Sequence, residues 1–255
     1  MKTTKKREKT FLGLLVLLSL SSLAMTQNHQ AVPAARAYVM SYRDFRLHTE
    51  IHIQNVRSLG LALYDRYHDT EFKEVSRQML AEKLRWHDHE KLASERELMA
   101  LGYEHSSPLG ERLYQYYGED KLKLSVAERV QFQDLIEELN FFAGKYELSF
   151  YQKYGLLSDQ SEPDIVAQKM ALIEKVADLV ERESNPISVE EFHREKMKPA
   201  EDFLSDPFEK KMARYLQQRY QDTVRLNPLG QRTQQAVGAR NLPVRCQGVY
   251  INGSG

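Results

Sequence analysis

The sequence predicts an all-α protein: one helical bundle over residues 38–225, preceded by a signal peptide. Several long segments carry apolar residues at the three- and four-residue spacing of a helix, whereas alternating strand patterns are scarce. Apolar residues make up 42% of the chain, which is enough for a domain of this length to bury one core. The sequence has no internal repeat and no coiled-coil heptad pattern.

The first 24 residues have the order of regions that defines a secretory signal peptide. A basic stretch from Lys2 to Lys9 precedes an apolar run over residues 11–20, and Ser22-Leu23-Ala24 offers the small residues at a cleavage site. The run is shorter than the ~20 apolar residues that span a membrane. We expect cleavage near Ala24, a linker over residues 25–37, and a periplasmic or secreted mature chain without a membrane span. An uncleaved N-terminal anchor is the alternative.

Charge and cysteine content exclude some classes of partner. The full chain has 36 basic and 36 acidic residues, and removal of the signal peptide leaves 31 basic against 35 acidic. A mature chain without basic excess is not expected to hold a large nucleic-acid footprint. Cys246 is the single cysteine, so no intrachain disulfide can form, which fits a periplasm better than a disulfide-rich exterior. The sequence does not indicate an oligomeric state.

The first predicted helix covers residues 42–67. Its apolar residues form one broad face, and Gly60 on that helix would let a neighbouring helix approach closely. His48 and His52 are four residues apart and therefore lie on one surface of the helix. The commoner role of a single histidine there is that of a partly exposed polar residue on a core helix.

The next helical pattern covers residues 74–91 and ends in His87-Asp88-His89-Glu90-Lys91. An imidazole directly followed by a carboxylate suits a divalent metal of intermediate hardness. A second such pair, His68-Asp69, lies about 24 Å from His52 if the first helix is continuous at 1.5 Å per residue. It therefore cannot share an ion with His52.

The remaining helices follow from periodicity and capping signals. Helical character is expected to continue to about Met99, and Ser125 with Glu128 forms a capping box that opens a helix rich in aromatic residues. Those aromatic residues are expected to be core. Two further helices are predicted over residues 164–183 and 207–224, and residues 226–255 are expected to form a loosely ordered tail.

Three segments in this order resemble the HD-domain superfamily of metal-dependent phosphohydrolases. His52 and Val56 are similar to the family's H-x-x-x-V helix, and His87 to Lys91 resembles its H-D-x-x-K segment. Val176-Ala177-Asp178 resembles its V-A-D. The matching pieces fall within residues 45–185, and the resemblance implies an HD-domain-like helical bundle.

The resemblance also implies a site. Its metal ligands would be His52, His87, Asp88 and Asp178, and Asp88 and Lys91 would act on a phosphorylated small molecule, with Lys91 holding a phosphate oxygen. Mixed nitrogen and oxygen ligands fit manganese, iron, cobalt, nickel or zinc. Some members of the superfamily bind a second metal through an additional histidine, and His105 stands in the corresponding region.

Several alternatives remain open at this stage. Asp134 also interrupts an apolar helix and competes with Asp178 as the last ligand. The chain could instead be a non-catalytic secreted binding or scaffold protein with a degenerate HD-like fold. A third possibility is a metal-binding protein without hydrolysis that uses His48 and His52 with His87 or His89. No phosphate-binding glycine loop and no nucleophile elbow occurs, which disfavours kinases and serine hydrolases.

Overall fold

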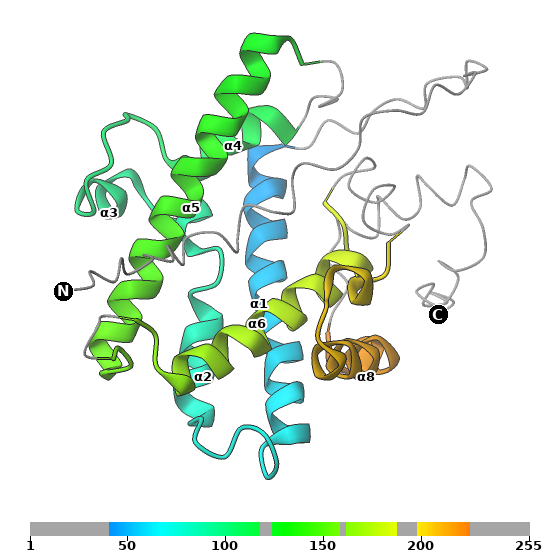
Figure 1. Ribbon diagram of the computed structural model, residues 1–255. Coiled ribbons are helices and arrows are strands. Elements are labelled where there is room, and N and C mark those ends of the chain that lie inside the picture. The colour runs from blue at the N-terminus through cyan, green and yellow to red at the C-terminus, as the bar shows by residue number, and fades with distance from the viewer. Residues whose placement is uncertain (1–40, 118–123, 159–161, 188–197, 225–255) are drawn as a thin grey trace, which may run out of the picture. The chain divides into compact units, whose positions relative to one another are not determined.

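The computed structural model describes residues 41–117, 124–158, 162–187 and 198–224, and they form an all-α structure without a β-strand. The predicted signal peptide, linker and C-terminal tail lie outside the described residues. The α-helices and the short 3-10 helices, labelled η, follow one another in this order (Figure 1): α1 (Tyr42–Tyr67), α2 (Arg77–Arg85), η2 (His89–Lys91), α3 (Glu95–Met99), α4 (Leu109–Tyr117), α5 (Val126–Tyr154), α6 (Ile165–Ser184), η4 (Ala200–Phe203) and α8 (Pro207–Thr223).

Short polar side chains begin most of these helices. The hydroxyl of Ser125 accepts a hydrogen bond from the backbone N–H of Glu128, and the Glu128 carboxylate accepts one from the N–H of Ser125. This confirms the predicted capping box. Asp164 begins α6 in the same way, because its side chain accepts from the N–H of Ala167. These caps satisfy backbone donors that a helix start would otherwise leave unpaired.

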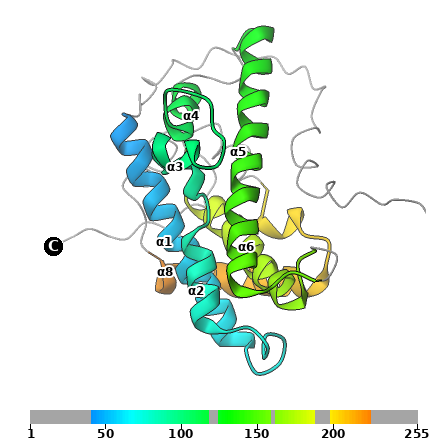
Figure 2. The same cartoon turned by 90° about the vertical axis from the view of Figure 1, so that its left-hand side faces the viewer.

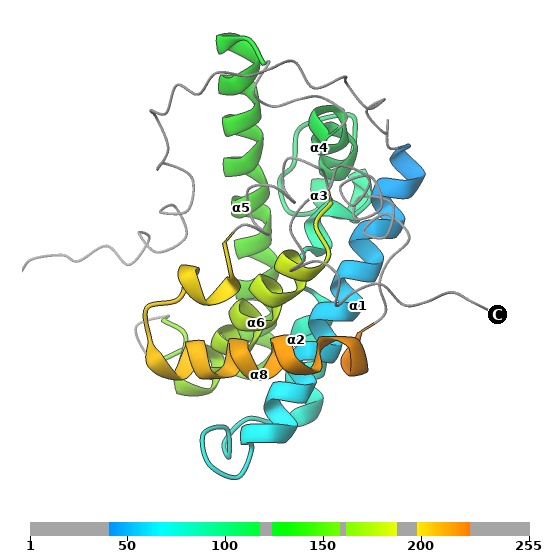
Figure 3. The same cartoon turned by 90° about the vertical axis from the view of Figure 1, so that its right-hand side faces the viewer.

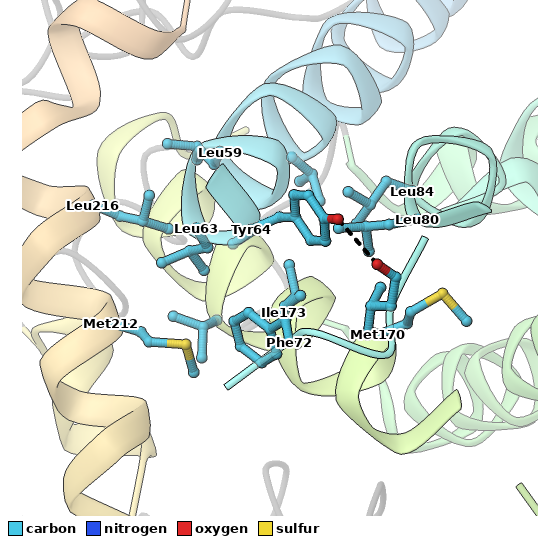
Figure 4. Packing of buried hydrophobic residues seen from close by; sticks show 14 of the residues in the cluster. Leu59, Leu63, Tyr64, Phe72, Leu80, Leu84, Met170, Ile173, Met212 and Leu216 are labelled. Atoms are coloured by element: carbon cyan, nitrogen blue, oxygen red, sulfur yellow. Dashed lines mark hydrogen bonds between the residues drawn. The ribbon is translucent and has the colours of Figure 1, made fainter. Parts of the chain in front are cut away.

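Helix α1 is the element against which the other helices of the main core pack. It contacts α2, α6 and α8, and α6 also contacts α8. Figure 3 shows α8 crossing α1 and α6, with α2 on the other side of α1. The main core is formed by buried apolar residues of these four helices and their connections, ten of which are labelled in Figure 4: Leu59, Leu63, Tyr64, Phe72, Leu80, Leu84, Met170, Ile173, Met212 and Leu216.

Gly60 allows α1 and α2 to approach closely. A Cβ atom at Gly60 would lie 2.6 Å from Cδ1 of Leu84 and 3.3 Å from Cγ2 of Ile173, so a larger residue would push against both. Figure 4 also shows the Tyr64 hydroxyl, which donates a hydrogen bond to the carbonyl of Val75 at 3.0 Å and ties α1 to the segment before α2.

A second apolar cluster joins the N-terminal part of α1 to α3, α4 and α5. Its buried members include Phe45, Leu98, Leu109, Leu139 and Phe142. Figure 2 shows α3 and α4 between α1 and α5. Leu84 belongs to the first cluster and Ala93 to the second. The segment between them, which contains His87 and Asp88, is therefore anchored at both ends.

Three sequence predictions differ from the structure in detail. The helix expected over residues 74–91 ends at Arg85, and the chain does not stay helical to Met99, because Ser94 starts α3 as a separate capped helix. The aromatic residues of α5 are only partly core, since Phe142 is buried whereas Phe141 is 57% exposed. No helix in the described part of the chain is long and apolar enough to cross a membrane.

Candidate metal centre

Helix α1 places His52 on its buried face, directed at α6. The ring is almost fully buried, and its Nδ1 lies 2.6 Å from Oε2 of Glu181. His48, one turn earlier, is also buried. The two histidines lie on one surface of the helix, as their four-residue spacing predicts, but that surface is buried and not partly exposed.

His87 and Asp88 lie in the turn between α2 and η2. Asp88 has φ 56° and ψ 18°, and it is the one non-glycine residue with positive φ among the residues that the structure describes. Aspartate tolerates this left-handed conformation better than most residues, but the strain is retained where the surrounding structure demands it. Helix α4 packs closely against the segment that follows this turn, since a Cβ on Gly110 would lie 1.9 Å from the carbonyl oxygen of Lys91.

Helix α6 supplies three carboxylates along one face. Glu174, Asp178 and Glu181 are separated by four and three residues, which aligns them over two turns. The rest of that helix is mainly apolar, with Met170, Ile173 and Val176 in the core. The three side chains meet the two histidines at the interface where α1, α6 and the His87-Asp88 turn pack together.

Four potential metal-ligating atoms, one each from His52, His87, Asp88 and Asp178, converge at this interface. The two Nε2 atoms of His52 and His87 are 3.1 Å apart. Nε2 of His52 lies 3.4 Å from Oδ2 of Asp88 and 3.3 Å from Oδ1 of Asp178. Nε2 of His87 lies 3.8 Å and 3.5 Å from the same two oxygens. Ligands that are 2.0–2.2 Å from one ion lie about 3.0–3.6 Å from each other, so most of these separations match a shared cation.

The remaining ring nitrogens are held by the other two carboxylates of α6. Nδ1 of His52 faces Glu181, and Nδ1 of His87 lies 3.1 Å from Oε1 of Glu174. A carboxylate beside Nδ1 accepts a proton from it, which leaves the lone pair of the neutral ring on Nε2. Two such lone pairs at 3.1 Å repel each other unless a proton or a metal cation lies between them. His52, His87 and Asp88 thus form a group that could hold a metal ion.

Electrostatics at the cluster favour positive charge. Burial alone would lower the pKa of each histidine, but the surrounding carboxylates overcome it: the pKa of His52 is raised well above its usual value, and that of His87 to about 10. Burial would raise the pKa of Asp88 and Asp178, yet nearby cations and imidazoles hold both well below the usual range. Without a metal, the carboxylates therefore retain protons on both rings, and a divalent cation carries the same charge as those two protons.

Three of the four carboxylates also have a cationic side chain in contact. Lys91 Nζ lies 2.6 Å from Oδ2 of Asp88, and Arg182 Nη1 lies 3.6 Å from Oδ2 of Asp178. Lys83 pairs with Glu174. Glu181 differs from these three. It is fully buried, and beyond His52 its hydrogen-bond partners are the neutral amides of Asn55 and Asn185, each 2.9 Å from Oε1.

The other sequence candidates lie apart from this cluster. Asp134 is exposed on α5, so the structure places Asp178, and not Asp134, beside the imidazoles. His105 is half-exposed, and its Nε2 is 3.5 Å from Oε1 of Glu138; among the residues that the structure describes, the two belong to no group of three metal-ligating side chains. His68 pairs with its neighbour Asp69 at the exposed end of the continuous helix α1, as the distance argument predicts.

Sequence reasoning missed the residues that hold the histidines. No sequence motif singles out Glu174 and Glu181, which face the two rings, or Lys83 and Asn55, which pair with these carboxylates. The signal was nevertheless present, because three acidic residues on one face of an otherwise apolar helix are unusual unless they have partners. The pattern does not identify those partners, which include His52 of α1, Lys83 of α2 and His87 of the turn after α2.

A cleft of about 710 Å³ lies beside this region, between α1 and the turn after α2. Its lining includes Arg57, Arg85, Trp86 and His89, but none of the four converging donors. His89 contributes its ring to this cleft, and its partner within reach is Glu97 at 3.9 Å. The cleft is thus a separate surface feature beside the donor cluster.

Comparison with known proteins identified no relative of this chain. A scan against protein-family models, a search of curated proteins and a search of solved structures each found no match to the chain.

Proposed function

We propose that the protein is an exported, metal-dependent phosphohydrolase of the HD type that acts on a phosphorylated small molecule. The observation that carries the proposal is that Nε2 of His52 and Nε2 of His87 lie 3.1 Å apart, and that each lies 3.3–3.8 Å from an oxygen of Asp88 and from an oxygen of Asp178. The resemblance of the three sequence segments to the HD superfamily supplies the reaction class, and the N-terminal signal pattern supplies the location.

The donor set fits a divalent ion such as manganese, iron, cobalt, nickel or zinc. Two neutral imidazoles and two carboxylates are ligands for metals of intermediate hardness, and each imidazole has a carboxylate on its other nitrogen. A bound ion would supply Lewis-acid chemistry, by activating water and neutralising charge on a phosphoryl group.

The chain's own residues would position the substrate. Lys91 lies next to Asp88 at the partly exposed edge of the cluster, so its ammonium group can turn to a phosphate oxygen without leaving the site. Arg182 stands on the other side, beside Asp178, with 41% of its side chain exposed. Two cations at the rim of a carboxylate cluster suit an anionic substrate, because they offset repulsion between the phosphate and the aspartates.

Two successive measurements, first of metal content and then of hydrolysis, test this proposal. The mature chain is purified without chelators, its metal is measured by elemental analysis, and a generic phosphoester is then tested after addition of manganese, nickel or zinc. We expect about one ion or more per chain and metal-dependent release of phosphate. Protein that takes up no metal and is inert with all three ions would refute the proposal.

One observation favours a second candidate, the non-catalytic binding protein. Helix α5 exposes large apolar side chains along its length, namely Val126, Val130, Phe141 and Leu148. Such residues on one helix are typical of a surface that meets a partner. Metal uptake without hydrolysis of any phosphoester would favour this candidate over the enzyme.

A further inference from the structure

Lys83 on α2 is a buried lysine, with 6% of its surface exposed. Lysine is rarely buried, because removing an ammonium group from water is costly unless it is paired and hydrogen-bonded. Its position therefore requires an explanation, and nothing in the proposed reaction uses Lys83 directly.

The ammonium group of Lys83 joins three helices. Nζ pairs with Glu174 of α6 and lies 3.1 Å from Oε1 of Glu147 on α5, and it stands 5.7 Å from the centre of the Tyr151 ring. Burial alone would lower the pKa of Lys83, but the two carboxylates raise it above its usual value, so the side chain keeps its charge.

Glu174 uses its two oxygens for two different partners. Oε2 pairs with Lys83, and Oε1 lies 3.1 Å from Nδ1 of His87. The carboxylate is thereby fixed in rotation, with Lys83 on one side and the imidazole on the other. His52 is held differently, because Glu181 is oriented by the amides of Asn55 and Asn185 and contacts no lysine or arginine among its described partners.

We propose that Lys83 is a positioning residue of the metal centre, which acts on His87 through Glu174 and has no corresponding effect on His52. The inference rests on the proposed metal site and adds the device that orients one of its two imidazoles. Lys83 also lies four residues before His87, so the same contact fixes the end of α2, from which the His87-Asp88 turn departs.

The test is a double-mutant cycle read out as metal release. Protein loaded with cobalt or zinc is mixed with excess chelator, and the release rate is followed. We expect Lys83→Met and Glu174→Gln each to speed release about tenfold or more, as is usual when an outer partner of a ligand is lost. The double variant should release metal no faster than Glu174→Gln alone, because both substitutions remove the same support.

Two controls separate this role from a structural one. Glu147→Gln removes the other partner of Lys83 and leaves the pair with Glu174, so release should stay within about twofold of wild type. Lys83→Met combined with Glu181→Gln should instead show multiplied effects, because Glu181 acts on the other ring. If the effects of Lys83→Met and Glu174→Gln on the release rate also multiplied in the double variant, the proposed route from Lys83 through Glu174 to His87 would be overturned.

NMR of the histidine rings gives a readout that does not depend on metal. In the metal-free protein, Lys83→Met should shift the ring signals of His87 and leave those of His52 in place. A lower Tm with unchanged metal release and unchanged His87 signals would mean that Lys83 serves stability alone. If Lys83→Met does not fold, the double variant with Glu174→Gln leaves no buried charge unpaired at this position and carries the test.

The proposed function can fail independently of this inference. Wild-type protein that binds no metal would remove the metal site, whereas the ring signals would still report whether Lys83 orients His87.

Discussion

Nε2 of His52 and Nε2 of His87 lie 3.1 Å apart, with a carboxylate of α6 on the far side of each ring. His52 lies in α1 and His87 in the turn after α2, and the two are separated by 35 residues in the chain. Neutral rings in this orientation point lone pairs at each other, so the arrangement is stabilised by a cation between them. Each of the following predictions depends on that relationship or on the elements that create it.

Loss of a ligand carboxylate should abolish metal retention. Asp88→Asn keeps a side chain that tolerates the left-handed backbone of this residue, but removes the negative charge that the ion requires. We expect Asp88→Asn and Asp178→Asn each to lose bound metal on dialysis, measured by elemental analysis, and to lose phosphoester hydrolysis.

Matched substitutions of the same type provide the control. Asp69→Asn lies in the exposed pair with His68, and Asp134→Asn lies on the exposed face of α5. Both should retain wild-type metal content. Equal losses in the Asp69 and Asp88 variants would contradict the assignment of the ligands.

Glu181→Gln should weaken metal binding without removing a ligand. The carboxylate of Glu181 accepts the proton of His52 Nδ1 at 2.6 Å, and an amide is a weaker acceptor that can also present its NH₂ group to the ring. We expect metal affinity to fall about 10- to 100-fold, the range typical of such outer partners. Competition with a chelator of known affinity measures the change, and an unchanged affinity would show that His52 needs no such support.

Metal binding should offset the pH dependence of stability that His87 causes. In metal-free protein the pKa of His87 is about 10, against 6.5 in the unfolded chain. The native state therefore holds this proton more tightly, and the resulting stabilisation is complete below about pH 6.5 and is lost as the pH rises through 10. A metal must displace the proton, so its binding strengthens over the same interval.

The measurable consequence is the difference in Tm between metal-loaded and metal-free protein. It should widen as the pH is raised from about 6.5 towards 10. Differential scanning calorimetry at several values in this interval checks it. A difference that narrows with rising pH would be inconsistent with displacement of a proton from His87.

Gly110→Ala should disturb the His87-Asp88 turn. A Cβ at this position would lie 1.9 Å from the backbone oxygen of Lys91, and a backbone atom cannot rotate away as a side-chain end can. We expect a loss of stability of about 1–3 kcal/mol, as for other overpacked sites, together with weaker metal binding.

Gly144→Ala is the matched control for this substitution. Gly144 lies within α5, and nothing comes within 4 Å of the added Cβ. Alanine is favoured over glycine inside a helix, so the variant should gain about 0.5–1 kcal/mol and bind metal normally. Thermal denaturation of both variants, with and without metal, makes the comparison. A Gly110→Ala variant as stable as Gly144→Ala would show that α4 does not press on the turn.

The sequence by itself determined the local features of this protein. The long helices, the capping box of Ser125 and Glu128, the close approach at Gly60 and the separation of His68-Asp69 from His52 all follow from patterns within a few residues. Such patterns are sufficient because helix periodicity, capping and axial rise are set by neighbours three or four positions away. The same patterns also marked His52, His87, Asp88 and Asp178 as residues to examine.

Only the tertiary structure decided which of these side chains meet, and what holds them. Asp178 and Asp134 look alike on their helices, but α6 packs against α1 and carries Asp178 to the imidazoles, whereas Asp134 faces outwards. The contact between His52 and Glu181 joins residues 129 positions apart, and that between Lys83 and Glu174 joins residues 91 apart. The physical reason is that such contacts are set by how α1, α2 and α6 pack together, and packing is a property of the whole core that no local sequence pattern encodes.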